Sequence, residues 1–204
     1  MSHQDYPLFH QPLIIGQFNS LGAAPISDST VGINHGRAWV DRYNVGMDEK
    51  NTLSEKAWFE TYLHRELPLS LAMEVSVMEV CETQVQLSAP LAPNRNDKNT
   101  GFGGSLASLL FMAGWGWLFN TLRRRGINAD VVVMDSTISY KRPTTGILLA
   151  SCSAPSSEAL GGFIKRLEHR GVARIGLTSW IGQRDEPNVM MEGRFVAKMD
   201  AEVR

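Results

Sequence analysis

The chain has 204 residues, of which 43% are hydrophobic and 20% are charged. A chain of this length and composition can bury a core of its own, and it fits one domain or one domain with an extension. Its 20 basic and 21 acidic residues give a formal net charge of -1, so it lacks the overall basic field that draws proteins to nucleic acid.

The start of the chain and its cysteines argue against a membrane, a secretory route and a metal. Residues 1–11 are polar, without a basic segment followed by an apolar stretch, and the longest apolar run, residues 106–119, is too short to span a bilayer. Cys81 and Cys152 each lie in an apolar run that is typical of a strand, and neither has ligand-spaced histidine or cysteine neighbours. We therefore expect a cytoplasmic protein with no metal or other cofactor and with both cysteines buried.

Residues 1–51 differ from the rest of the chain, because prolines, glycines and serines interrupt every pattern in them. We expect an N-terminal extension there, to which no structure is assigned, and one domain over residues 52–204. The first helix of this domain is predicted over residues 52–66. Its apolar residues recur at helical spacing, Thr52 or Ser54 can cap its start, and a proline follows its end.

Two strands and a long apolar helix come next. Residues 73–81 and 85–89 alternate apolar and polar side chains, the first with a slip in its alternation, and together they predict a hairpin. Residues 105–125 predict a helix that is apolar on nearly all sides, so other parts of the protein must enclose it. Three arginines in its last turn complement the negative pole of the helix dipole, and Gly126 caps its end.

Four more strand-like runs follow, with one short helix between the second and the third. The strands are predicted over residues 131–141, 147–154, 172–181 and 189–198, and the helix over residues 156–169. Because alternating strand and helix units are lacking, the pattern favours the α+β class, with an antiparallel sheet wrapped around the single enclosed helix. The exposed side of that helix needs a partner, so we expect a homodimer or a dimer of such dimers.

The loop before the enclosed helix carries the most distinctive motif, PNRNDKNTGFGGSL at residues 93–106. It resembles the glycine loop of the thioesterase family named for YiiD C-terminal domains, as do LHRELPLS at 63–70, AGWG at 113–116, SYKRP at 139–143 and GRF at 193–195. The joint pattern covers most of the expected domain. The resemblance implies a hot-dog fold and an enzyme that hydrolyses acyl thioesters of coenzyme A or of acyl carrier protein.

The start of the enclosed helix is the candidate catalytic centre. Free backbone N–H groups and the positive end of the helix dipole meet there, and they would stabilise an oxyanion that develops on a thioester carbonyl. Gly103 and Gly104 carry no side chain that would hold a substrate away, and Ser105 could orient a water molecule. The alternative is that the glycines only allow the helix to pack closely beneath the sheet.

Asn96 and Asp97 are the polar catalytic candidates. Asn96 lies six positions before Phe102, the offset at which the related phenylacetyl-CoA type of thioesterase carries an asparagine. Its amide would hold a water or polarise the carbonyl, and the Asp97 carboxylate would act as a general base. An Asx turn at Asn96 and a solvated loop charge at Asp97 are equally good interpretations. Thr100, Phe102 and Arg142 are the expected substrate contacts.

The enclosed helix departs from the related enzymes in one respect. They carry an Asp or Glu on this helix as base or nucleophile, whereas residues 105–120 contain no carboxylate. Asp135, on the next predicted strand, is a further candidate whose facing the sequence leaves open. Two alternatives to hydrolysis therefore stay open. One is decarboxylation of a malonyl group on acyl carrier protein, which runs through an enolate without an attacking base, and the other is binding of acyl thioesters without catalysis.

Basic residues offer contacts for the phosphates of coenzyme A or for an acidic carrier protein. They cluster at residues 123–125, 141–142 and 165–166. Solvated helix ends and strand tips explain these clusters equally well.

Overall fold

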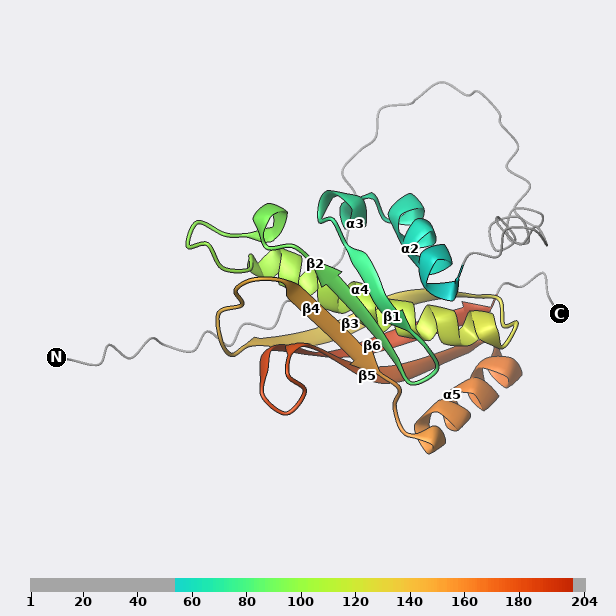
Figure 1. Cartoon of the computed structure of the whole chain (residues 1–204). Coiled ribbons are helices and arrows are strands. Elements are labelled where there is room, and N and C mark those ends of the chain that lie inside the picture. The colour runs from blue at the N-terminus through green and yellow to red at the C-terminus, as the bar shows by residue number, and fades with distance from the viewer. Residues whose placement is uncertain (1–53, 200–204) are drawn as a thin grey trace, which may run out of the picture.

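The computed structural model describes residues 54–199, so the expected extension over residues 1–51 lies outside the described residues. The chain forms six strands, four α-helices and one short 3₁₀ helix, Ala92–Asn94, within this range (Figure 1). The helices are α2 (Glu55–Glu66), α3 (Pro68–Ala72), α4 (Gly103–Arg124) and α5 (Ser157–Arg170), and the strands are β1 (Ser76–Val80), β2 (Gln84–Ala89), β3 (Ala129–Tyr140), β4 (Leu148–Ser153), β5 (Val172–Gly182) and β6 (Pro187–Met199).

The six strands form one antiparallel sheet that wraps around α4. Their order is β1-β2-β4-β5-β6-β3, and every neighbouring pair is antiparallel. Figure 1 shows α4 running along the sheet, with α2 and α3 near β1 and α5 beside the far end of α4. The expected α+β class and the hot-dog arrangement of a sheet around one central helix are therefore confirmed.

The enclosed helix is built as its composition predicts. Its apolar side chains are buried along almost its whole length, and Trp117 is fully buried. The two glycines of the AGWG motif let neighbours approach, because an added Cβ would lie 2.7 Å from the Phe195 ring at Gly114 and 2.6 Å from the Phe59 ring at Gly116. Within residues 54–199, α4 is the one helix long and apolar enough to cross a membrane, but 72% of its most apolar window is buried inside the fold.

Two local features near β1 differ from the sequence prediction. Pro68 does not only end α2: it is the first residue of α3, a position where the missing N–H of proline costs no helical bond. Glu74 has a positive φ of 55°, so the chain turns there and β1 starts at Ser76 rather than at residue 73. The slip in the alternation is confirmed as an irregular register between Val77 and Glu79.

The two edges of the sheet are not equivalent. At the β1 edge, the Glu60 carboxylate of α2 accepts a hydrogen bond from the Val77 N–H at 2.6 Å, and His64 Nε2 lies 2.7 Å from the Val75 carbonyl oxygen. No described element covers the β3 edge in the same way, and Val132 and Met134 on it are 57% and 50% exposed. The open edge, defined here as strand β3, is therefore the place where another chain can pair.

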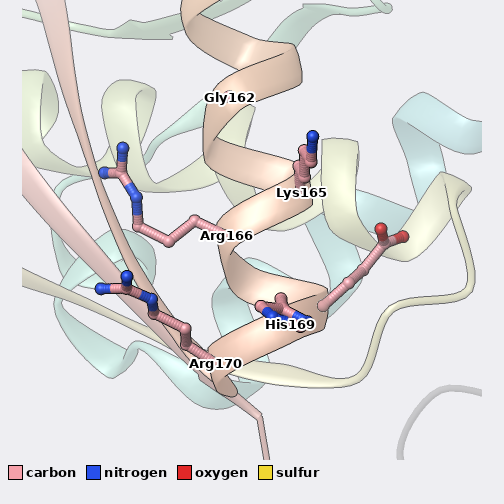
Figure 2. Close-up of a pocket in the computed structure, with 6 residues that line it drawn as sticks. Gly162, Lys165, Arg166, His169 and Arg170 are labelled. Atoms are coloured by element: carbon pink, nitrogen blue, oxygen red, sulfur yellow. The ribbon is translucent and has the colours of Figure 1, made fainter.

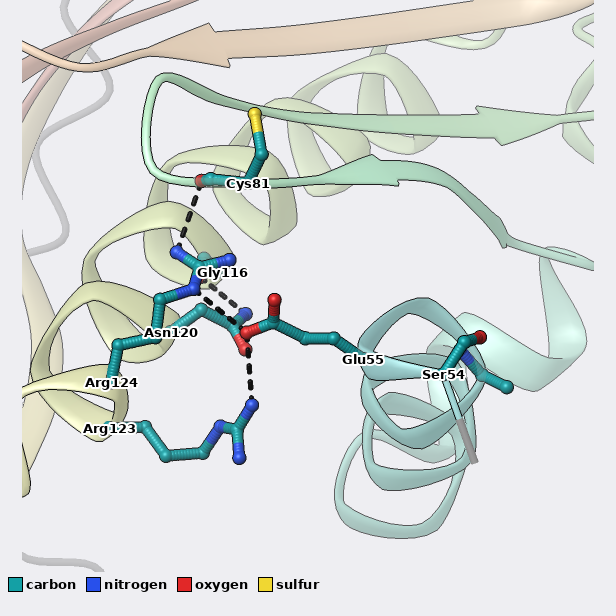
Figure 3. Close-up of polar contacts among 8 residues, drawn as sticks. Ser54, Glu55, Cys81, Gly116, Asn120, Arg123 and Arg124 are labelled. Carbon is teal, nitrogen blue, oxygen red and sulfur yellow. Dashed lines mark hydrogen bonds and ion pairs between the residues drawn. The ribbon is translucent and has the colours of Figure 1, made fainter. Parts of the chain in front are cut away.

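The arginines at the end of α4 tie that helix to α2 (Figure 3). One oxygen of Glu55 accepts hydrogen bonds from Arg123 at 3.0 Å and from Arg124 at 2.8 Å, and Arg124 also donates to the Cys81 carbonyl at 3.1 Å. The Arg123 guanidinium stacks over the Trp58 ring at 4.0 Å. Both arginines therefore stabilise the packing of α4 against α2. They lie at the C-terminal end of α4, far from the glycine loop at its N-terminal end.

The two cysteines have different surroundings. Cys152 is fully buried, and burial raises its pKa to about 12, although a hydrogen bond with Ser179 acts in the opposite direction. Its thiol therefore stays protonated at neutral pH, and the expectation of a buried, unreactive residue is confirmed. Cys81 lies at the turn after β1 and is only half-buried, so the same expectation was wrong for it.

Candidate active site

The first turn of α4 presents three free backbone donors. The helix begins at Gly103, and its N-cap residue Phe102 makes no side-chain capping bond. The first intrahelical hydrogen bond runs from the Leu106 N–H to the Phe102 carbonyl at 2.9 Å. The N–H groups of Gly103, Gly104 and Ser105 therefore have no acceptor among the described residues. Together with the positive end of the helix dipole they favour a negative charge at this point.

The loop before α4 is held from both sides, which fixes the position of these donors. The buried Asn94 side-chain nitrogen donates to the carbonyls of Met73 and Pro90, both at 2.8 Å, and the backbone carbonyl of Asn94 accepts the Phe102 N–H at 2.7 Å. On the other side, the Gly101 N–H donates to the Thr144 carbonyl at 2.8 Å. The motif alone did not single out Asn94, because nothing in its spacing indicates which asparagine turns inward.

The side-chain amide of Asn96 forms hydrogen bonds within its own loop. Its side-chain oxygen accepts the N–H groups of Lys98 at 2.9 Å and Thr100 at 3.1 Å, and its side-chain nitrogen donates to the Thr100 hydroxyl at 2.9 Å. This is the Asx-turn interpretation of Asn96. Asp97 beside it is exposed and makes no ion pair or hydrogen bond with the rest of the described chain. The structure thus brings both residues to the loop that precedes α4, and their catalytic roles stay predictions.

Two half-exposed aromatic rings flank the free donors. The Phe102 ring lies over Gly104, where an added Cβ would come within 2.5 Å of it. The Tyr140 ring lies beside Gly103, and its hydroxyl donates to the Gly103 carbonyl at 2.9 Å. Burial raises the pKa of Tyr140, so its hydroxyl remains a donor at neutral pH. Sequence reasoning missed Tyr140, although its place at the end of the strand before the SYKRP turn was the available signal.

An apolar pocket opens one helical turn further along α4. It has a volume of about 460 Å³ and is lined by side chains from α3, α4, β3 and β6, among them Leu69, Phe111, Trp115 and Phe195. This volume lies in the usual range for small-molecule sites. Ser108 also lines the pocket and lies three residues after Ser105, hence on the same face of the helix. The pocket therefore lies along the side of α4 that carries Ser105, and its lining on this helix begins at Ser108.

Asp135 lies on the face of the sheet that is turned away from α4. In the register of β3 and β6, Val133 pairs with Phe195 and Asp135 pairs with Arg194. Phe195 is buried against α4, so the next residue, Arg194, points to the opposite face, where it forms an ion pair with Asp135. This carboxylate raises the pKa of Arg194. The sequence did not decide which face of the sheet Asp135 occupies. Because the side chain points away from α4, Asp135 is not a candidate base.

Arg142, an expected substrate contact, is engaged with the loop between β5 and β6. Its guanidinium donates to the Glu186 carboxylate at 2.6 Å and to the Glu186 carbonyl at 2.7 Å. Two exposed cations near the glycine loop lack such partners among the described residues: Lys98 within the loop and Lys141 directly after Tyr140. These lysines are better placed than Arg142 to meet a phosphate without giving up an existing ion pair.

The basic residues of α5 surround a separate hollow (Figure 2). This hollow of about 620 Å³ is lined by Lys165, Arg166, His169 and Arg170, with Glu168 and Gly162. A neighbouring hollow joins α5 to Arg125, the residue that follows α4. Because the 22 residues of α4 span about 33 Å, these cations lie at the opposite end of that helix from Gly103. They are therefore remote from the free N–H groups of the same chain.

Comparison with known proteins gives a consistent picture. A family model described as "Putative thioesterase (yiiD_Cterm)" matches residues 56–199. A crystal structure of a Chlorobaculum tepidum protein with unknown function is similar at 30% identity and a TM-score of 0.67, and the match covers 70% of this chain and 93% of that chain.

Two further crystal structures show the same fold at lower identity. A "putative thioesterase" from Shewanella oneidensis is 23% identical with a TM-score of 0.60, over 70% of this chain and 96% of that chain. A Pseudomonas aeruginosa protein described as "Probable Thioesterase" is 16% identical with a TM-score of 0.59, over 70% of this chain and 95% of that chain.

Proposed function

Because the chain belongs to the thioesterase family of the YiiD C-terminal type, we propose that it hydrolyses acyl thioesters of coenzyme A or acyl carrier protein at the start of α4. The observation that carries this proposal is the set of free N–H groups from Gly103 to Ser105, beside an apolar pocket. Such donors stabilise the charge that develops on a carbonyl oxygen in acyl transfer.

The reaction proceeds by attack of water on the thioester carbonyl carbon. As the new C–O bond forms, the carbonyl π electrons move to oxygen, and the free N–H groups bind the resulting oxyanion. The carbonyl then reforms, the C–S bond breaks, and the thiolate takes up a proton, which leaves a carboxylic acid and a thiol. Asp97, exposed in the glycine loop, is the proposed base that accepts the proton of the water.

The pocket beside α4 suits the acyl chain. With the carbonyl at Gly103 to Ser105, an apolar chain would follow the helix past Ser108 towards Trp115. Burial of each methylene in such a pocket contributes about 0.8 kcal/mol, so the chain holds the ester in place. Lys98 and Lys141, which are exposed at the same end of α4, would meet the phosphate of the carrier arm.

The absence of a carboxylate on α4 favours a second candidate, decarboxylation of malonyl thioesters. In that reaction the malonyl carboxylate leaves as carbon dioxide, and the electrons of the broken C–C bond form an enolate that the same N–H groups would stabilise without an attacking base. The enolate then takes up a proton from water to give the acetyl thioester. We expect purified protein to release free thiol from acyl-CoA and acyl-carrier substrates.

A malonyl thioester of the carrier protein distinguishes the alternatives. Release of carbon dioxide without thiol would identify a decarboxylase. If neither thiol nor carbon dioxide is released, the protein only binds thioesters.

A bulky residue in the pocket should shorten the range of accepted acyl chains. Replacing Val133 with tryptophan is expected to lower kcat/KM for a dodecanoyl thioester about tenfold, because the ring displaces roughly two methylenes. Activity on an acetyl thioester should stay close to that of the wild type. Val172→Trp, at an exposed valine outside this pocket, is the matched control. Equal losses on both substrates would argue against the acyl pocket.

The open edge supports a homodimer as the working assembly. α2 already covers part of α4, through the contact of Phe59 with Gly116 and the stacking of Tyr62 on Trp115 and Phe119. Within residues 54–199 no strand pairs with the outer edge of β3, and the exposed Val132 of this strand also lines the pocket. We therefore propose pairing of two β3 strands around a twofold axis.

Placing a charge on the open edge should weaken this assembly. Met134→Lys is expected to raise the dimer dissociation constant about tenfold or more, because each copy would bring an added positive charge to the paired β3 strands. Met78→Lys, on the edge that α2 covers, introduces the same change at a methionine of similar exposure. Sedimentation velocity at several protein concentrations distinguishes the two. A wild-type chain that remains monomeric at every concentration would contradict the proposal.

A further inference from the structure

We infer that Tyr140 is a positioning residue, whose hydroxyl holds the first peptide unit of α4 so that the Gly104 N–H faces the thioester oxygen. This inference rests on the proposed function. It concerns a residue that touches neither the carbonyl nor the attacking water, and that acts through the backbone of the helix.

The geometry follows from the planarity of the peptide bond. The Tyr140 hydroxyl donates to the Gly103 carbonyl oxygen at 2.9 Å. The Gly103 carbonyl and the Gly104 N–H belong to one trans peptide plane and point in opposite directions. A hydrogen bond that fixes the direction of the oxygen therefore also fixes the direction of the N–H.

The first turn of α4 needs such a support more than most helix starts. Gly103 and Gly104 have no side chain to restrict their backbone, and Phe102 gives no side-chain cap. Ser108 donates to the Gly104 carbonyl at 2.9 Å and restrains the next peptide in the same manner, but it belongs to α4 and moves with it. Tyr140 comes from β3, so its hydrogen bond ties the start of the helix to the sheet.

The same hydrogen bond also makes the Gly104 N–H a better donor. A donor on the carbonyl oxygen polarises the peptide unit, which strengthens the hydrogen bond that its N–H makes. Charge on the thioester oxygen grows as water attacks, so this effect is larger in the transition state than in the bound ester. Loss of the hydroxyl should therefore lower kcat and leave KM nearly unchanged.

Tyr140→Phe tests this inference, because it keeps the ring beside Gly103 and removes only the hydroxyl. We expect kcat for acyl-CoA hydrolysis to fall about tenfold, a part of the 100-fold or larger effect of losing a whole oxyanion donor. KM should stay within about twofold of the wild-type value. Tyr62→Phe, in the ring stack on α2, makes the same chemical change away from the first turn of α4.

An infrared measurement separates this role from a purely structural one. The carbonyl of a bound, ¹³C-labelled acyl-CoA should stretch at lower frequency in the wild type than in solution, and the Tyr140→Phe variant should lose part of that shift. An unchanged kcat in an active enzyme overturns the positioning role, as does an equal loss in Tyr62→Phe. If wild-type protein releases no thiol, hydrolysis is contradicted, and the infrared shift alone then decides whether Tyr140 orients the N–H.

Discussion

Replacing Gly103 with proline should lower kcat for thioester hydrolysis by about 100-fold or more while the fold stays intact. Gly103 is the first residue of α4, where proline is well tolerated because that N–H makes no intrahelical bond. Phe102 before it has a ψ of 130°, the extended conformation that a following proline requires. The substitution therefore removes one of the three free N–H groups and keeps the helix.

There is space at Gly103 for the Cβ of a proline. An added Cβ would lie 3.6 Å from the Tyr140 ring, which is ordinary contact. Ser157→Pro is the matched control, since Ser157 is the exposed first residue of α5 and the Ser156 before it has a ψ of 148°. Both variants should have the same midpoint of urea unfolding as the wild type, and only Gly103→Pro should lose activity. An active Gly103→Pro enzyme would show that this N–H does not bind the oxyanion.

Truncation of Trp117 to alanine should lower the free energy of unfolding by about 3 to 5 kcal/mol. Trp117 is fully buried in α4, and its indole N–H donates to the Glu82 carbonyl at 3.2 Å. Alanine would leave a cavity between α4 and the sheet and would deprive that carbonyl of its donor.

Urea unfolding followed by circular dichroism measures this loss. Trp117→Phe keeps most of the buried volume, so its loss should be clearly smaller. Leu71→Ala, on the exposed part of α3, should change the free energy of unfolding by no more than about 0.5 kcal/mol. A loss below about 1 kcal/mol in Trp117→Ala would contradict the enclosure of α4 by the sheet.

The fold was predictable because its strongest signals are local. An apolar pattern on all sides of residues 105–125 requires an apolar environment, and the alternating runs around it predict strands that can supply one within the protein. α3 was missed because proline both ends one helix and starts another, and only the tertiary structure shows which occurs. The early turn at Glu74 depends on a positive φ, which a glutamate in the sequence does not indicate.

The candidate site was only partly predictable. The glycine loop located the free N–H groups, since their exposure follows from the helix start itself. The use of Asn96 within its own turn, and the bond from Tyr140 to Gly103, depend on how distant segments meet. The facing of Asp135 was hidden for a similar reason, because an irregularity in the register between Val133 and Asp135 breaks the simple alternation of β3.

The difference between the two sheet margins also limits how these molecules can associate. Strands lengthen a sheet without end only if both of its borders accept a newcomer, as in fibrils. At one border, Glu60 accepts the Val77 N–H and His64 contacts the Val75 carbonyl oxygen, so two copies joined through β3, as proposed above, would leave only borders that α2 partly covers. Removing these two contacts, with Glu60→Ala and His64→Ala together, would weaken that cover and bring the proposed pair closer to a unit that can add copies at both ends.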